Sequence, residues 1–248
     1  MDGDGYVEFA LYGAPGELPE LPTGPAHIGS TPVEVSTTSL GDDWADRWRE
    51  FHKPARIGDI HVRAPWHEPA EDGIEIVIDP GQAFGTGAHP TTRLCLELLQ
   101  EVTGGAHGEP GRGPLAGRGP LADLGCGSGV LAIAAAKLRF APVSAFDNEV
   151  AAVEATLGNA RANGVTLERV DRCDLRTEPA PVEQTTVANL VRPLLLEVAE
   201  LLPEQPQTLI VSGLLEGEEE EVAAAFAPLR ERRRRRLHGW SAILLTRP

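Results

Sequence analysis

The second half of the chain alternates between strand-like and helix-like runs, and this feature limits its possible folds more than any other. From residue 120 onward, a short apolar run is followed by a segment of helical periodicity, and the pattern then repeats. The pairs are residues 120–125 and 129–138, 142–147 and 150–164, 184–190 and 193–202, and 207–214 and 216–229, with a further strand-like run at 167–174. The alternation predicts βαβ units, and therefore an α/β fold in which helices cover both faces of a parallel sheet.

The chain closes with two strand-like runs within residues 232–247, separated by His238 and Gly239. A hairpin at this point adds an antiparallel strand to the sheet. The run from Arg232 to Arg236 suggests either a nucleic-acid contact or an edge strand whose positive charges prevent edge-to-edge pairing. Because the whole chain has a net charge of −15, which repels phosphate, we favour the edge strand and expect no stable binding of nucleic acid.

The N-terminal part is different in character. Strand-like runs at 6–13 and 31–39 flank a segment rich in Pro and Gly, and residues 1–41 are too few for an independent core. We expect them to form a reduced α+β appendage. Residues 42–67 are predicted to be a helical connector, because Trp44, Trp48 and Phe51 recur at helical spacing before Pro54 ends the run. The main domain is then expected over residues 68–248.

Composition narrows the class of protein further. The apolar content of 42% and the charged content of 24% are ordinary for a globular protein. No apolar run reaches the roughly 20 residues that span a bilayer, and the acidic start of the chain lacks the basic stretch of a signal peptide. The three cysteines are widely spaced and the histidines lack paired ligand spacing, so we predict neither a disulfide framework nor a metal site. A reducing, cytoplasmic environment fits these features.

Two glycine-rich segments indicate a small-molecule cleft. The first, PGQAFGTGAHPTT at residues 80–92, follows a strand predicted at 73–80, and Thr91 or Thr92 is expected to cap a helix that runs to residue 102. The second, DLGCGSG at residues 123–129, separates a predicted strand from its helix. Residues 104–120, which lie between the two segments, have low complexity and are predicted to be a flexible surface connection.

The second segment favours a cationic ligand. Its glycines read GxGxG, which is neither the GxGxxG of dinucleotide-binding folds nor the GK[ST] of a P-loop. Asp123 would repel a pyrophosphate but attract an ammonium or a sulfonium group. Asp147 ends the next strand, where a carboxylate can accept both ribose hydroxyls. S-adenosylmethionine carries both cations and a ribose, so the pattern favours it over NAD, although each aspartate alone is equally consistent with a helix cap.

Residues 42–248 resemble the PrmA family, the bacterial methyltransferases that modify ribosomal protein eleven of the large subunit. The most distinctive similarity lies in residues 78–99, and residues 43–59, 123–138, 145–164 and 187–202 also match. The resemblance implies a Rossmann-like, seven-stranded class I methyltransferase sheet with an antiparallel last strand. It also implies S-adenosylmethionine as cofactor, methyl transfer to lysine side chains or the N-terminus of a protein, and substrate recognition by residues 1–41.

Matched position by position, the family's cofactor residues fall on Thr92, Gly125, Asp147 and Asn189. We also place in the predicted cofactor site Phe84, Gly85, Thr86, Asp123, Gly127, Gly129, Asn148 and Asp174. The FGTG segment is expected to fold over the cofactor, with Phe84 near it and Thr92 capping its helix toward it. A plainer interpretation stays open, in which Phe84 fills the core and Gly85 and Gly87 only form a tight turn.

Asn189 and His89 are the candidate catalytic residues. The side-chain oxygen of Asn189, or the neighbouring carbonyl, can accept a hydrogen bond from an incoming amine and so aim its lone pair at the methyl group. His89 can accept a proton or orient the substrate. The alternatives are that Asn189 is a turn residue and that His89, which precedes a proline, is structural.

The expected partner is a basic ribosomal protein of the large subunit, because an acidic enzyme suits a lysine-rich target. We expect a monomer without a membrane contact. Two other functions remain open: a class I methyltransferase that acts on another protein or a small amine, and a non-catalytic module that holds the cofactor. The FGTGAHPTT segment and Asn189 favour an enzyme, since a binding module has no need of a group that orients an amine.

Overall fold

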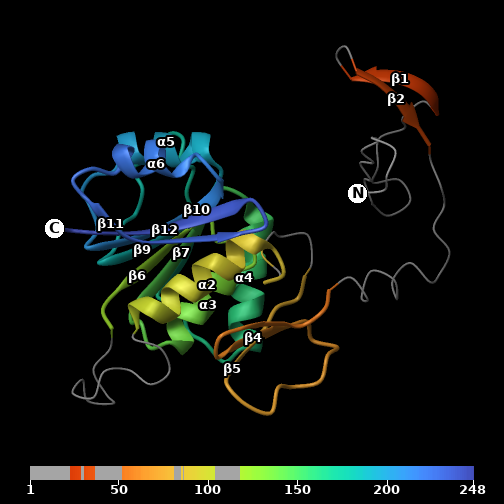
Figure 1. Cartoon of the computed structure of the whole chain (residues 1–248). Coiled ribbons are helices and arrows are strands. Elements are labelled where there is room, and N and C mark those ends of the chain that lie inside the picture. The colour runs from red at the N-terminus through yellow and green to blue at the C-terminus, as the bar shows by residue number, and fades with distance from the viewer. Residues whose placement is uncertain (1–22, 29–30, 37–51, 81–84, 86, 104–117) are drawn as a thin grey trace. The chain divides into compact units, whose positions relative to one another are not determined.

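The structure, a computed structural model of the chain, describes residues 23–28, 31–36, 52–80, 85, 87–103 and 118–248 (Figure 1). It divides into two compact units, residues 1–48 and residues 49–248. In the first unit, β1 (Gly24–Ile28) pairs with β2 (Thr31–Val35) in an antiparallel arrangement. β2 confirms part of the strand predicted at 31–39. β1 was not predicted, because Gly and Pro at its start lower its strand propensity, and the run predicted at 6–13 lies outside the described residues.

The second unit is built on a seven-stranded sheet. In chain order its strands are β6 (Leu121–Leu124), β7 (Val143–Asp147), β8 (Arg169–Arg172), β9 (Thr185–Asn189), β10 (Thr208–Leu215), β11 (Arg230–Leu237) and β12 (Trp240–Thr246). Their spatial order is β11-β12-β10-β9-β6-β7-β8, and the strands from β10 to β8 are parallel. β12 is antiparallel to both of its neighbours. The predicted α/β class, with an antiparallel strand contributed by the C-terminal hairpin, is confirmed.

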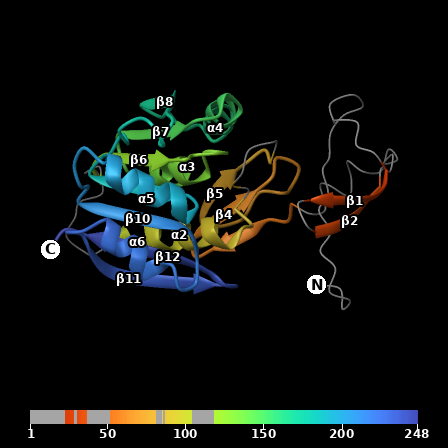
Figure 2. The same cartoon turned by 90° about the horizontal axis from the view of Figure 1, so that it is seen from above.

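Helices cover both faces of this sheet (Figures 1 and 2). One face carries α2 (Pro90–Val102), α3 (Val130–Lys137) and α4 (Val150–Ala162), and the other carries α5 (Arg192–Leu201) and α6 (Glu219–Ala225). Because neighbouring residues of a strand point to opposite faces, each strand supplies two cores. Leu121 and Ile210 pack on the side of α2 and α3, whereas Leu124 and Val211 pack on the side of α5 and α6. Each such side chain contributes about 1.5–3 kcal/mol when fully buried.

Part of the helical connector predicted over 42–67 belongs to a small second sheet. Residues 55–63 form a hairpin of β3 (Ala55–Ile57) and β4 (Ile60–Arg63), and β5 (Ile74–Val77) joins β4 in parallel. The hairpin forms because the alternating apolar residues of 55–62 are buried against α2, and because Gly58 adopts the positive φ (57°) that its turn requires. β5 confirms the strand predicted at 73–80. The aromatic residues that suggested a helix, Trp44, Trp48 and Phe51, lie outside the described residues, as do 104–117 of the predicted surface connection.

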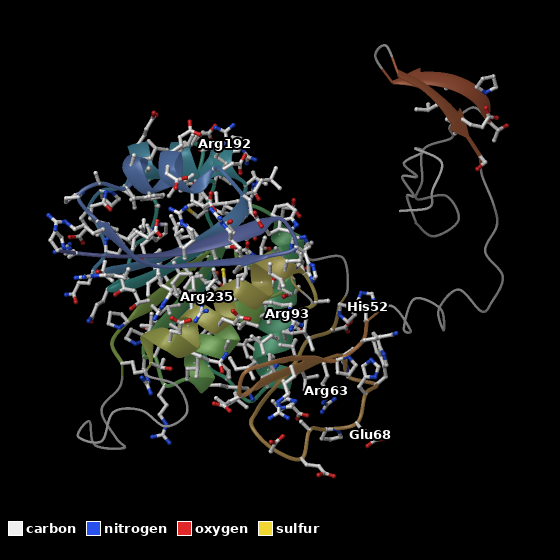
Figure 3. The ribbon with its side chains drawn as sticks, in the orientation of Figure 1. His52, Arg63, Glu68, Arg93, Arg192 and Arg235 are labelled. Atoms are coloured by element: carbon white, nitrogen blue, oxygen red, sulfur yellow. The ribbon has the colours of Figure 1, made fainter. Side chains whose placement is uncertain are left out.

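The arginine-rich run is an edge strand, as predicted. β11 lies at one end of the sheet, and its turn into β12 uses His238 and Gly239 with φ of 50° and 79°. Its arginines alternate in direction. Arg235, which is labelled in Figure 3, and Arg233 each form an ion pair with Glu101 of α2. Arg236 instead forms an ion pair with Glu219 of α6 at 2.7 Å. Across the described part of the chain, no helix combines the length and apolarity that a bilayer crossing requires.

Candidate active site

A cleft lies where the strand order reverses. From β6 the chain moves through α3 to β7 and then β8, and it later returns to β9 on the other side of β6. In open parallel sheets, ligands bind beyond the carboxyl ends of the strands at such a point. The cleft has a volume of about 220 Å³ and follows the ends of β6, β7, β8 and β9. Its walls are Gly125, Gly127, Asp147, Asn148, Glu149, Ala152, Cys173, Leu175, Arg176, Asn189, Leu190 and Leu194.

The glycine loop between β6 and α3 can exist only with glycines at its turning points. Gly125, Gly127 and Gly129 have φ of 72°, 53° and 80°, a region that other residues rarely adopt. A Cβ on Gly125 would lie 2.3 Å from Leu190 Cδ2, and a Cβ on Gly129 would lie 2.8 Å from the nearest carbon of Thr156. The loop therefore presents bare backbone to the cleft, which lets a ligand approach closely.

Asp147 is held in place by two backbone hydrogen bonds. As the last residue of β7, it accepts a hydrogen bond from Gly127 N at Oδ2 (2.9 Å) and from Glu149 N at Oδ1 (3.0 Å). Each carboxylate oxygen has a lone pair beyond these bonds, so both oxygens can accept hydrogen bonds from the hydroxyl groups of a ligand in the cleft. Asn148 follows it in the wall, and its carbonyl accepts a hydrogen bond from Arg172 Nε (2.8 Å).

Asp123 takes a different place from Asp147, although in the sequence each lies near the turn between a predicted strand and its helix. Its side chain is fully buried and is not part of the cleft wall. Oδ2 accepts a hydrogen bond from Ala132 N (3.0 Å) in the first turn of α3, and Oδ1 has no hydrogen-bond partner among the residues that the structure describes. Burial, with a smaller effect from the charge of Asp147, raises the pKa of Asp123 to about 7. This arrangement is the helix-capping alternative, and a direct contact between Asp123 and a cofactor stays a prediction.

Asn189 and Thr92 are brought together from distant parts of the chain. Asn189 ends β9 in the cleft wall, and its Nδ2 lies 3.5 Å from the hydroxyl oxygen of Thr92, which is buried in the first turn of α2. The expectation that Thr91 or Thr92 caps this helix was wrong. The helix begins at Pro90 and its N-cap is His89, because a proline is preorganised for the first helical position.

His89 has a structural role in this arrangement. Its Nδ1 accepts a hydrogen bond from Thr91 N (3.3 Å) and lies 2.8 Å from Thr91 Oγ1. Its ring packs edge-on against Trp240, with 5.0 Å between ring centroids. Burial lowers the pKa of His89, so the ring is neutral at pH 7. The predicted role of His89 in accepting a proton or orienting the substrate stays a prediction.

The first glycine-rich segment contacts the glycine loop at Gly85. This buried residue has a φ of 107°, and its carbonyl accepts a hydrogen bond from Ser128 Oγ (2.6 Å). Gly87, with a φ of 81°, packs so closely that a Cβ would lie 2.7 Å from Val62 Cγ1. Phe84 and Thr86 lie outside the described residues, so their predicted contacts with a cofactor stay predictions.

Asp174 lies beside the cleft but not in its wall. Its Oδ1 accepts a hydrogen bond from Arg176 N (3.1 Å), and the Arg176 guanidinium lies 3.7 Å from the same oxygen. The wall here consists of Cys173, Leu175 and Arg176, which the sequence interpretation did not include. Their position directly after β8 was the available signal, since residues that follow a parallel strand meet at the ligand-binding edge. Leu190 and Leu194, which follow β9 and also line the cleft, were missed although the same signal was available for them.

The chain is similar to known proteins over almost its whole length. The model of the family described as ribosomal protein L11 methyltransferase (PrmA) matches residues 24–248. A ribosomal protein L11 methyltransferase from Geobacter sp. (strain M21) is 37% identical over 234 residues, which is 92% of this chain and 74% of that protein. One from Citrifermentans bemidjiense is 36% identical with the same coverage.

A solved structure gives the same result. The crystal structure of a ribosomal protein L11 methylase from Lactobacillus delbrueckii subsp. bulgaricus superimposes with a TM-score of 0.64 at 26% identity. The superposition covers 78% of this chain and 98% of that one. The seven-stranded sheet and the cleft at its switch point are therefore found within a chain that has methyltransferase relatives in both sequence and structure.

Proposed function

The chain belongs to the ribosomal protein L11 methyltransferase (PrmA) family, and from this premise we propose that it methylates amino groups of ribosomal protein L11. It is a methyltransferase, and S-adenosylmethionine is its methyl donor. The observation that carries the proposal is the family match over residues 24–248, because this range includes every residue of the cleft.

The residues of the cleft fit S-adenosylmethionine. Gly125 and Gly127 line the cleft with bare backbone, which lets a ligand approach closely. Asp147 offers two oriented oxygens to the ribose hydroxyls. The carboxylates of Asp147 and Glu149 in the wall also favour a ligand with a positive charge.

When bound, S-adenosylmethionine supplies a methyl group on a sulfonium that a neutral amine can attack. We propose that Asn189 orients this amine. Because its Nδ2 points to Thr92 Oγ1, its Oδ1 is available to accept a hydrogen bond from the amine. Alignment of this kind supplies about 7–11 kcal/mol of barrier reduction in well-oriented reactions. Burial raises the pKa of Cys173 in the wall, which keeps this thiol neutral and unsuited to act as a base.

The substrate and the setting follow from the family. Relatives named ribosomal protein L11 methyltransferase point to that protein as the acceptor. The net charge of −15 favours a basic protein over a nucleic acid. We propose that the enzyme acts as a monomer in the cytoplasm, where ribosomal proteins are made, without stable nucleic-acid binding.

Methyl transfer to purified proteins tests the proposal. The chain is incubated with S-adenosylmethionine and L11, and intact-mass spectrometry counts the methyl groups added to L11. We expect transfer to L11 and a large loss of transfer with Asn189→Ala. Transfer to another protein or to a small amine, with none to L11, would support the broader class I alternative. Cofactor binding without transfer to any acceptor would support a non-catalytic module.

A further inference from the structure

One face of α4 links the glycine loop to a distant part of the chain. Thr156, Asn159 and Asn163 are three and four residues apart, so their side chains lie on the same side of the helix. Thr156 and Asn159 are buried. Thr156 Oγ1 donates a hydrogen bond to Gly127 O (3.0 Å), and Asn159 Nδ2 donates one to Ser128 O (2.9 Å). Two successive carbonyls of the loop are thus turned toward α4.

Asn159 also reaches the end of β5. Its Oδ1 accepts a hydrogen bond from Asp79 N (3.0 Å) while its Nδ2 binds Ser128. Ser128 in turn donates through Oγ to Gly85 O (2.6 Å). Asp79 and Gly85 stand on either side of residues 80–84. The backbone of Asp79 is fixed by the Asn159 side chain and that of Gly85 by the Ser128 side chain.

Asn163 offers a natural comparison on the same helix face. Its Oδ1 accepts from Val77 N (2.9 Å) and its Nδ2 donates to Val77 O (2.6 Å), as a neighbouring strand would. Among the described residues, Asn163 Nδ2 also donates a hydrogen bond to Asn159 O (2.8 Å), and the side chain makes no bond to the glycine loop. Asn163 therefore holds β5 to α4 much as Asn159 does, but without a contact to Ser128.

We propose that Asn159 and Ser128 are positioning residues that set the affinity for the cofactor by fixing the glycine loop against the chain at Asp79 and Gly85. They act through Gly127, which precedes Ser128 and donates the hydrogen bond that orients Asp147. When Asn159 no longer binds the Ser128 carbonyl, the Ser128–Gly129 peptide loses this restraint. The loop then holds the Gly127 N–H less firmly, and the Asp147 carboxylate loses its fixed direction. This inference rests on the proposed function, because the loop concerned is the one that would hold S-adenosylmethionine.

Calorimetry and thermal unfolding together test this role in the full chain. S-adenosylmethionine is titrated into the unmodified protein and into Asn159→Ala, Ser128→Ala and Asn163→Ala, and the melting temperature of each is measured. We expect Asn159→Ala and Ser128→Ala to raise the dissociation constant about tenfold, equivalent to about 1.4 kcal/mol. Asn163→Ala should lower the melting temperature as much as Asn159→Ala does but keep the dissociation constant within about twofold.

A fourth variant isolates the bond to the loop. Asn159→Asp keeps an acceptor for Asp79 N but replaces the donor to Ser128 O, so it should weaken cofactor binding as Asn159→Ala does. If Asn159→Ala fails to fold, Ser128→Ala decides the matter. The inference is overturned if Asn159→Ala and Ser128→Ala bind as the unmodified chain does, or if Asn163→Ala weakens binding equally. An unmodified chain that does not bind S-adenosylmethionine refutes the proposed function itself, and the inference with it.

Discussion

Replacement of Asp147 by alanine is the most direct test of the cofactor cleft. The carboxylate accepts hydrogen bonds from Gly127 N and Glu149 N and keeps one lone pair on each oxygen for the ribose. A hydrogen bond to a charged group contributes about 1.5–3 kcal/mol, so the loss of two ribose contacts corresponds to about 3–6 kcal/mol. Because Asp147 is only half-buried, we expect the lower end, which is roughly a 100-fold weaker affinity.

The assay is isothermal titration of S-adenosylmethionine into Asp147→Ala, with Asp171→Ala as the matched control. Asp171 is also a carboxylate, but it lies exposed on the neighbouring strand β8 and pairs with Arg169 at the surface. An exposed pair of this kind contributes at most about 1 kcal/mol, and the control should bind the cofactor normally. A folded Asp147→Ala protein whose affinity matches that of the control would refute the assignment of the ribose contact.

Three further predictions concern turnover and stability. Asn189→Ala should slow methyl transfer about 100-fold, as loss of an oriented polar group does, while calorimetry shows nearly unchanged cofactor affinity; an unchanged rate would exclude the orienting role. Gly213→Ala should destabilise the fold by about 2–4 kcal/mol in urea unfolding, because its φ is 86° and a Cβ would lie 2.2 Å from Leu190 O; an unaltered midpoint would contradict this. Because the pKa of Asp123 is higher in the folded state, the folded protein holds a proton on this carboxyl at pH values where the unfolded chain has lost it. The stability that this proton contributes is complete below pH 3.8 and is lost as the pH rises through about 7. Asp123→Asn should flatten that part of the stability curve, and an equally steep curve would show that another group is responsible.

The main sheet could be predicted because the chain repeats two clear periods. Apolar runs of strand length alternate with helical segments from residue 120 onward, and the His238–Gly239 pair marks the last hairpin. Both signals are local, and tertiary packing agrees with them. The hairpin of β3 and β4 could not be found in the same way. Its two strands have only three and four residues, which is too short for a clear alternation, and the aromatic residues at helical spacing just before them lie outside the described residues.

The cap of α2 shows a different limit. Ser, Thr, Asp and Asn are the usual N-caps, so the threonines after Pro90 were the natural choice. The proline instead takes the first helical position, and the imidazole Nδ1 of His89 serves as the acceptor for Thr91 N. Nothing in the sequence distinguishes this histidine from one that acts on a substrate. The contact of its ring with Trp240 could not be predicted either, because the two residues are far apart in the chain.

Asp123 and Asp147 show why the electrostatics of the site also needed the structure. Asp147 is the last residue of β7, whereas Asp123 lies one residue before the end of β6. In the register of the sheet Asp123 pairs with Ala145, so Asp147 lies two residues further along on the same face. Asp123 is therefore covered by the first turn of α3, whereas Asp147 reaches the edge that lines the cleft. Burial and the nearby charge of Asp147 both oppose ionisation of Asp123. In the proposed function, the negative charge that would attract a sulfonium or an ammonium is carried in the cleft wall by Asp147 and Glu149, whereas Asp123 binds the first turn of α3 within the core.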